Sequence, residues 1–90
     1  MPYNLVVNEK DQQYEFHVAG SVAKIEFKRK ENKIYLIHTE VPQELGGKGI
    51  ASALVKAVLE DIEKKNLTLI PKCPFVAGYL ERHPEWKRLT

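Results

Sequence analysis

Hydrophobic and polar residues alternate over the first 41 positions, with the period of two that β-strands show. Ala23, Ile25 and Phe27 fall on one side of an extended chain, and charged residues fall on the other. Short polar turns separate segments of this kind. The pattern predicts an antiparallel meander with strands at residues 4–8, 13–18, 22–28 and 34–41.

The period changes after the fourth predicted strand. Apolar residues recur at helical spacing over 48–65, and the run Leu67-Thr68-Leu69-Ile70 then predicts a fifth strand. Cys73-Pro74 opens a second helix over 75–82, and His83-Pro84 closes it. A strand, helix and strand of these lengths favour parallel pairing through a right-handed crossover. We expect an α+β (α/β) fold in which a meander is followed by β-α-β-α. We also expect Trp86 to pack on the sheet.

Composition and charge narrow the class of protein. The chain has 90 residues, 43% of them hydrophobic, which predicts one domain over 1–90 with a modest core. The net charge of +2 does not by itself indicate nucleic acid. One cysteine excludes an internal disulfide framework, and the three histidines lack metal-ligand spacing, so we expect no metal. We find no signal peptide or membrane anchor, and we expect a cytoplasmic protein.

Three glycines stand immediately before the long predicted helix. Gly46, Gly47 and Gly49 surround Lys48 at a place where helix amides lack partners and carry partial positive charge. Such a turn is suited to bind phosphate, although a plain turn is the alternative. A P-loop requires a glycine where Pro42 stands, and a dinucleotide fingerprint requires one at Ser52, so neither motif fits.

The glycine turn resembles motif A of the GNAT superfamily of acyl-CoA-dependent N-acyltransferases, written [QR]-x-x-G-x-[GA]. The matching stretch runs from Glu44 to Gly49, although Glu44 and Gly46 depart from the usual residues at their positions. Cys73-Pro74-Phe75 further resembles a minimal, single-domain bacterial group of predicted acetyltransferases. The fold that this resemblance implies is GNAT-like but reduced. Only about four residues separate the first two strands, so the acceptor-side helices have no room.

The resemblance implies a binding site for acetyl-CoA as cosubstrate, without a metal. Backbone amides of the turn and helix start would hold the pyrophosphate, and the strand before the turn, 38–41, would pair with pantetheine. The implied cofactor-binding residues are Thr39, Val41, Leu45, Gly46, Gly47, Lys48, Gly49, Ile50, Ala51 and Ser52, the last through its hydroxyl. Lys48 is either a cation near the phosphates or a solvated side chain.

The chemistry of acetyl transfer suggests four catalytic candidates. An amine must lose a proton, and His38 and Glu40, two apart on one strand, face the same side and could act as base. Cys73 at a helix N-cap should have a lowered pKa, and its thiolate could accept the acetyl group. The resemblance implies Tyr79 as the proton donor to the coenzyme A sulfur. Each also has a structural reading: a hydrogen-bonded or solvated polar residue for His38 and Glu40, and core packing for Cys73 and Tyr79.

Three hypotheses of function follow. The first is an enzyme that moves an acetyl group from acetyl-CoA to a primary amine of a small molecule or protein. The second is a module that binds acetyl-CoA or coenzyme A without turnover. The third is a small basic nucleic-acid binder built on the meander, in which the aromatic residues Tyr14, Phe16, Phe27 and Tyr35 could stack bases. However, Tyr14, Phe16 and Tyr35 also fit a sheet face packed by helices. The basic run Lys28–Lys30 is more often a solvated turn than a nucleic-acid patch.

Overall fold

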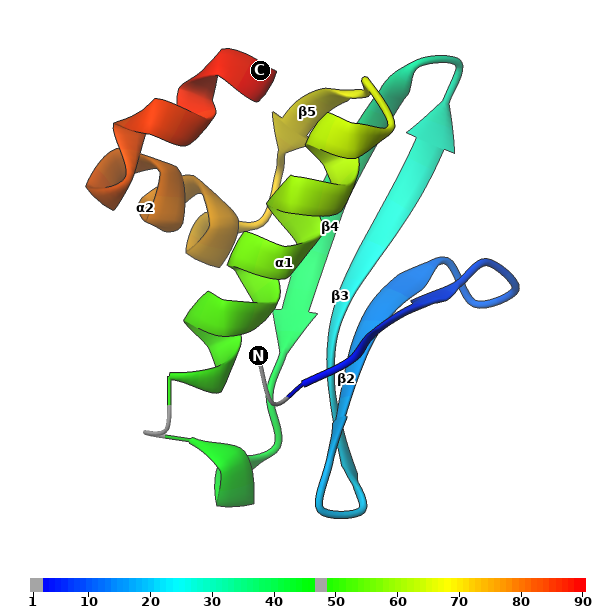
Figure 1. Ribbon diagram of the computed structural model, residues 1–90, viewed down its shortest axis with the longest axis vertical. Coiled ribbons are helices and arrows are strands. Elements are labelled where there is room, and N and C mark those ends of the chain that lie inside the picture. The colour runs from blue at the N-terminus through cyan, green and yellow to red at the C-terminus, as the bar shows by residue number, and fades with distance from the viewer. Residues whose placement is uncertain (1–2, 47–48) are drawn as a thin grey trace.

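A computed structural model describes residues 3–46 and 49–90 of the chain. Five strands form one sheet in the order β1-β2-β3-β4-β5 (Figure 1). Their bounds are β1 Leu5–Asn8, β2 Gln13–Val18, β3 Ser21–Lys30, β4 Lys33–Glu40 and β5 Thr68–Pro71. The first four strands pair antiparallel, and β5 pairs parallel with β4. Both the meander and the parallel fifth strand are therefore confirmed.

Two helices cover one face of the sheet. Helix α1, Ile50–Lys64, crosses from the end of β4 to the start of β5, and α2, Pro74–Arg82, follows β5 (Figure 1). Two short 3₁₀ segments complete the described chain, η1 at Gln43–Leu45 and η2 at Pro84–Leu89. The predicted β-α-β-α order is confirmed. The 48–65 prediction for the first helix is longer than the observed α1, because Gly49 is its N-cap.

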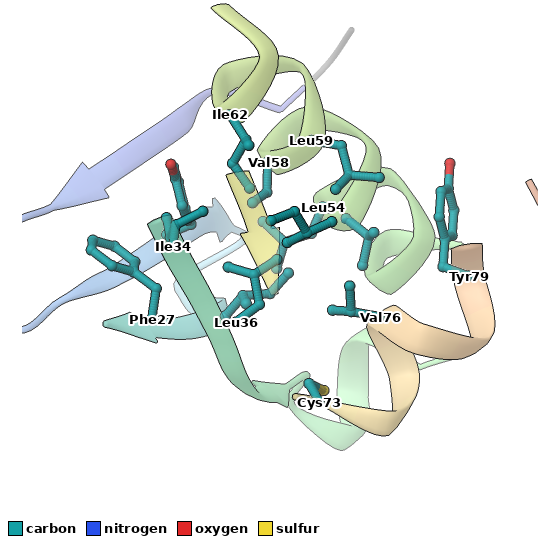
Figure 2. Close-up of a cluster of buried hydrophobic side chains, with 14 of the residues drawn as sticks. Phe27, Ile34, Leu36, Leu54, Val58, Leu59, Ile62, Cys73, Val76 and Tyr79 are labelled. Carbon is teal, nitrogen blue, oxygen red and sulfur yellow. The ribbon is translucent and has the colours of Figure 1, made fainter. Parts of the chain in front are cut away.

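The core lies between the sheet and the two helices. Leu54, Val58 and Ile62 recur at helical spacing on α1 and are fully buried against Ile34 and Leu36 of β4 (Figure 2). Burial of each such side chain contributes about 1.5–3 kcal/mol to folding. The apolar residues that the sequence places on one side of each strand therefore form the face that the helices cover.

The opposite side of the sheet, called here the open face, is covered by no helix of the described residues. Its members are alternate residues of the strands, and Val6, Val22 and Ile37 are its exposed large hydrophobic side chains. Polar residues occupy most of its other positions. Register brings Glu15, Lys24 and Glu40 side by side across three neighbouring strands.

A β-bulge in β4 changes which side chains face the helices. Glu26 pairs with His38, whereas the next residue, Phe27, pairs with Leu36, so Ile37 is an extra residue in β4. An extra residue shifts the alternation of side chains by one. Leu36 faces the helices before the bulge, and Thr39, opposite the buried Ile25, faces them after it.

Two predictions of side-chain placement are corrected. Tyr35 does not join the helix-packed face, because Ile34 and Leu36 on either side of it occupy that face and turn Tyr35 to the open face. Trp86 lies in η2, a segment that packs mainly against α2 and α1 rather than on the sheet (Figure 1). Arg88 lies over its ring at 4.8 Å.

Candidate functional site

Strands β4 and β5 diverge at the bulge. Their pairing ends at Leu36 and Pro71, after which the amides of Lys72 and Cys73 both donate to the Leu36 carbonyl, at 3.0 and 2.8 Å. The chain then turns into α2. Beyond Leu36, β4 continues along β3 alone, and no strand of the described residues pairs with its other side. An unpaired strand edge therefore faces the start of α2.

The unpaired edge offers backbone hydrogen-bonding groups at alternate residues. The N–H and C=O of one strand residue point to the same neighbour, so residues two apart share an edge. Thr39 turns its amide toward the Cys73 sulfur, so Thr39 and Val41 share this side of β4, and the Thr39 amide is already engaged with the thiol. An extended ligand can add to such an edge as a further strand. We call the backbone of residues 39–41 the β4 edge.

Cys73 lies where the two strands separate. It is the N-cap of α2, as predicted, with Pro74 as the first helical residue, and it is 3% exposed. Its Sγ is 3.2 Å from Thr39 Oγ1. Burial by itself raises the pKa of the thiol, but hydrogen bonds from Thr39 and from the amides of Val76 and Phe75 outweigh it, and the pKa lies below its ordinary value.

The glycine turn begins with η1, which uses two of the predicted phosphate-binding amides. Leu45 N–H donates to Pro42 O at 2.9 Å and Gly46 N–H to Gln43 O at 3.0 Å. These two amides are engaged within the turn in this structure. A Cβ at Gly46 would approach Gln43 O to 3.2 Å, which explains a glycine there without a ligand. Gly47 and Lys48 lie outside the described residues.

The start of α1 has amides without helical partners. Gly49 is the N-cap in a left-handed conformation, with φ 71°, and no side chain of the described residues caps the helix. The amides of Ile50, Ala51 and Ser52 belong to the first turn, where intrahelical acceptors are lacking. Ser52 is exposed, whereas the Ile50 side chain is buried in the core. These residues form the part of the predicted phosphate site that the geometry leaves accessible.

A tether outside the glycine turn positions it. Ser21 Oγ donates to Glu44 Oε2 at 2.6 Å, which joins η1 to the β2–β3 hairpin. This hydrogen bond lowers the pKa of Glu44. Glu44, which departs from the family motif, thus has a local structural role.

His38 and Glu40 lie on the open face, on the other side of β4 from the thiol. Their side chains are about 60% exposed, and His38 Nε2 is 3.8 Å from Glu40 Oε1. Lys24 Nζ is 3.9 Å from the same carboxylate oxygen. The two candidate bases share a side, as predicted, but the bulge turns them away from Cys73. A molecule that reached them would approach from the open face.

Tyr79 lies apart from the other candidates. It is six residues along α2 from Cys73, roughly 9 Å along the axis, and its hydroxyl points away from the thiol (Figure 2). Its ring stacks on His83 with centroids 4.3 Å apart. Burial, with the charges of Glu85 and Glu60, raises the pKa of its hydroxyl. The structure therefore brings Thr39 and Cys73 together and leaves Tyr79 outside that group.

The sequence did not predict the bulge. It also did not predict that the Leu36 carbonyl accepts from Lys72 and Cys73, where the chain after β5 turns away from β4. A bulge of this kind has no composition of its own, since Ile37 is an ordinary strand residue. The nearest signal is the phase of the pattern: Ile34 and Leu36 predict that His38 and Glu40 face the core, although both are polar.

Among residues 3–46 and 49–90, no group of three or more potential metal ligands comes together. None of the described helices is long and apolar enough to cross a membrane.

The fold and site together define a small α+β protein whose sheet opens between two parallel strands beside a glycine turn. A family model described as GCN5-related N-acetyl-transferase matches residues 13–89. The chain belongs to this family. The solution NMR structure of a protein described as "a GCN5-like putative N-acetyltransferase from Staphylococcus aureus" is similar to it, with 28% sequence identity and a TM-score of 0.74. The similarity covers 96% of this chain and 85% of that one.

Proposed function

We propose that this protein transfers the acetyl group of acetyl-CoA to a primary amine. The observation that carries the proposal is the unpaired β4 edge, which faces a buried thiol of lowered pKa where β5 ends. Membership of the GCN5-related family supports the class of reaction.

The proposed cofactor position follows from the first-turn amides of α1 and from the β4 edge. The pyrophosphate lies at the N–H groups of Gly49 to Ser52, where the helix terminus favours negative charge. Pantetheine extends along the β4 edge as an added strand, and the thioester reaches the point where Cys73 and Thr39 meet. Leu45 and Gly46 shape the turn in this proposal but donate no bond to the ligand.

The proposed reaction needs an uncharged amine and a proton for the leaving thiolate. The amine nitrogen attacks the thioester carbonyl carbon, the C–S bond breaks, and the amine proton is passed on while coenzyme A leaves as its thiol. An acceptor that approaches from the open face meets His38 and Glu40, which can receive the proton directly or through water. Direct attack needs Cys73 only as a wall of the site. An acetyl-cysteine route needs its thiolate as nucleophile.

A titration of ¹⁵N-labelled protein with acetyl-CoA tests the cofactor site. We expect saturable shifts at Gly49 to Ser52 and at Thr39, and acetylation of an added amine in the same tube. Desulfo-CoA carrying no acetyl group serves as the matched ligand, since it should give the shifts without product. Absence of shifts at millimolar acetyl-CoA would contradict the proposal.

A binding module without turnover is the second candidate. Its specific support is the connection between β1 and β2, which is only the four residues 9–12 and holds no helix over the open face. Acetyl-CoA shifts without acetylated product for any amine offered would favour it. For either candidate we propose the cytoplasm as the setting, because Cys73 is a free thiol and a reducing compartment keeps it so.

A further inference from the structure

A groove on the open face lies beside the diverging strands. Its volume is about 400 Å³, within the range of small-molecule sites. Tyr35 and Ile37 of β4 form an apolar floor. The other lining residues are all cationic: Lys28, Arg29, Lys30 and Lys72.

The charges of the groove are uncompensated among the described residues. None of the ion pairs that the structure shows includes Lys28, Lys30 or Lys72. By contrast, Lys24 on the same face contacts Glu26 at 3.2 Å. The surface of the groove is almost entirely apolar, so the lysines line it with their aliphatic stems and can place their ammonium groups at its rim. This arrangement is complementary to a ligand with an apolar body and a negative group.

The groove and the proposed reaction centre share two stretches of backbone. Ile37, part of the floor, is the bulge residue immediately before His38, and Lys72 immediately precedes Cys73. Tyr35 and His38 pair with Lys28 and Glu26, which are two residues apart on β3, so the bulge leaves a span of about 7 Å between them. A molecule held in the groove therefore reaches His38, one of the two candidate bases, with its other end.

We infer that the acceptor is an amine that also carries an anionic group roughly 7 Å from its nitrogen, the span of about two strand residues. Lys28, Lys30 and Lys72 hold the anion, and the chain between the two groups lies on Tyr35 and Ile37. The amine then lies near His38 on the open face. This inference rests on the proposed function, because it names the acceptor of that reaction.

Binding is tested first without an amine and without turnover. Hexanoate and hexanamide have the same apolar chain and differ in charge. Followed by ¹H–¹⁵N NMR, hexanoate should bind about fivefold more tightly, shift the amides of Lys28, Ile37 and Lys72, and lose this preference at high salt. Equal affinity for the two compounds, or shifts elsewhere, would overturn the inference.

Matched lysine variants show whether the groove is responsible. Lys28→Gln/Lys72→Gln should abolish the preference for hexanoate. Lys10→Gln/Lys64→Gln removes the same charge from exposed positions outside the groove and should keep it. A preference that survives in the first variant, or disappears in both, contradicts the assignment. The assignment is also contradicted if an RNA oligonucleotide shifts the groove amides at a lower concentration than hexanoate does.

Turnover then distinguishes this inference from the proposed function. If the protein acetylates 6-aminohexanoate with a kcat/KM at least fivefold above that for 6-aminohexanamide, the inference is supported. Equal use of both compounds leaves the acetyltransferase proposal intact and overturns the anionic acceptor. Acetyl-CoA binding is read separately at Gly49 to Ser52. If hexanoate binds but acetyl-CoA does not, the groove is no acceptor site and the inference fails with the function.

Discussion

At the scale of single residues, the site depends on hydrogen bonds to Cys73, a group whose charged form is disfavoured inside a protein. Cys73 is buried, which disfavours its thiolate, yet donors from β4 and from the start of α2 hold its pKa below the ordinary value. Perturbed pKa values of this kind gather at functional sites. The burial of Cys73 and its lowered pKa both depend on residues that are distant in the sequence, since Thr39 and Cys73 are 34 residues apart.

The Thr39 hydroxyl contributes to the lowered pKa of Cys73. Thr39→Val removes the hydroxyl and keeps the shape, so the thiolate loses a donor and the pKa should rise. The rate of alkylation by iodoacetamide, followed by mass spectrometry against pH, should show an inflection at higher pH in the variant. Ser21→Ala removes a hydroxyl that bonds Glu44 instead and should leave the inflection in place. An unchanged inflection in Thr39→Val would refute this role.

Glu15 makes stability depend on pH. Hydrogen bonds from Gln13, Asn8 and His17 lower the pKa of its carboxyl. A lowered folded-state pKa stabilises the protein above the unfolded value, about 4.3, and this contribution is lost as pH falls through the folded-state value. Urea titrations should therefore show that Glu15→Gln is less stable than the parent at pH 7 and that the difference shrinks in acid. The exposed Glu31→Gln serves as control, and a difference independent of pH would contradict the assignment.

At the scale of elements, the glycines of this chain serve different purposes. Gly49 ends the turn in a left-handed conformation, φ 71°, and begins α1. Gly78 lies inside α2, where a Cβ would meet only the Arg82 side chain at an ordinary 3.7 Å. The same substitution should therefore have opposite effects at the two positions.

Alanine at these two glycines tests that difference. Gly49→Ala should lower the free energy of unfolding by about 1–2 kcal/mol, because a side chain disfavours the left-handed region. Gly78→Ala should raise it by about 0.5–1 kcal/mol, because alanine is the better helix former. Denaturant unfolding of both variants measures the two changes. Equal changes at both positions would show that φ at Gly49 is not what selects glycine.

The first turn of α1 supplies the proposed phosphate-binding amides. Proline is tolerated in a first helical turn, so Ala51→Pro deletes one N–H without removing an intrahelical bond. The variant should bind acetyl-CoA about tenfold more weakly, as expected for one lost bond to a charged group of about 1.5 kcal/mol. Ala51→Gly keeps the N–H and should bind within about threefold of the parent. Isothermal calorimetry gives both affinities, and equal affinity for Ala51→Pro would exclude this amide.

At the scale of the whole molecule, helices cover only one face of the sheet, so the two faces of the sheet have different roles. The helix side buries the core, and the open face has the groove, His38 and Glu40. The aromatic residues that the nucleic-acid hypothesis requires are largely in the core, since Tyr14, Phe16 and Phe27 are buried.

A partly buried hydrogen bond joins the sheet to the helix layer. Tyr14 Oη donates to Asp61 Oδ2 at 2.8 Å, linking β2 to α1, and Asp61 also pairs with Lys65 at 2.9 Å. Tyr14→Phe should lower the free energy of unfolding by about 1.5–3 kcal/mol, the usual range for a bond to a charged group. Tyr35→Phe on the open face is the matched control and should change it by less than about 0.5 kcal/mol. Chemical denaturation of both variants measures the two changes in the free energy of unfolding.

The local pattern determined most of the fold. Period-two alternation placed Ala23, Ile25 and Phe27 in the core, and helical spacing placed Leu54, Val58 and Ile62 there, because burial follows from period and polarity alone. Pro74 likewise determined that Cys73 is an N-cap. Boundaries moved by one or two residues, as at Gly49, because caps depend on backbone geometry that composition does not specify.

Only the tertiary structure decided how these pieces meet. The bulge at Ile37 reversed the side chains that follow it, so Thr39 reaches Cys73 while His38 and Glu40 face outward. The packing of η1 engaged the amides of Leu45 and Gly46. An inserted residue and a hydrogen bond between distant strands depend on which surfaces are brought together. A one-dimensional pattern contains local preference, whereas contacts between residues far apart in the chain exist only after the sheet and helices have packed.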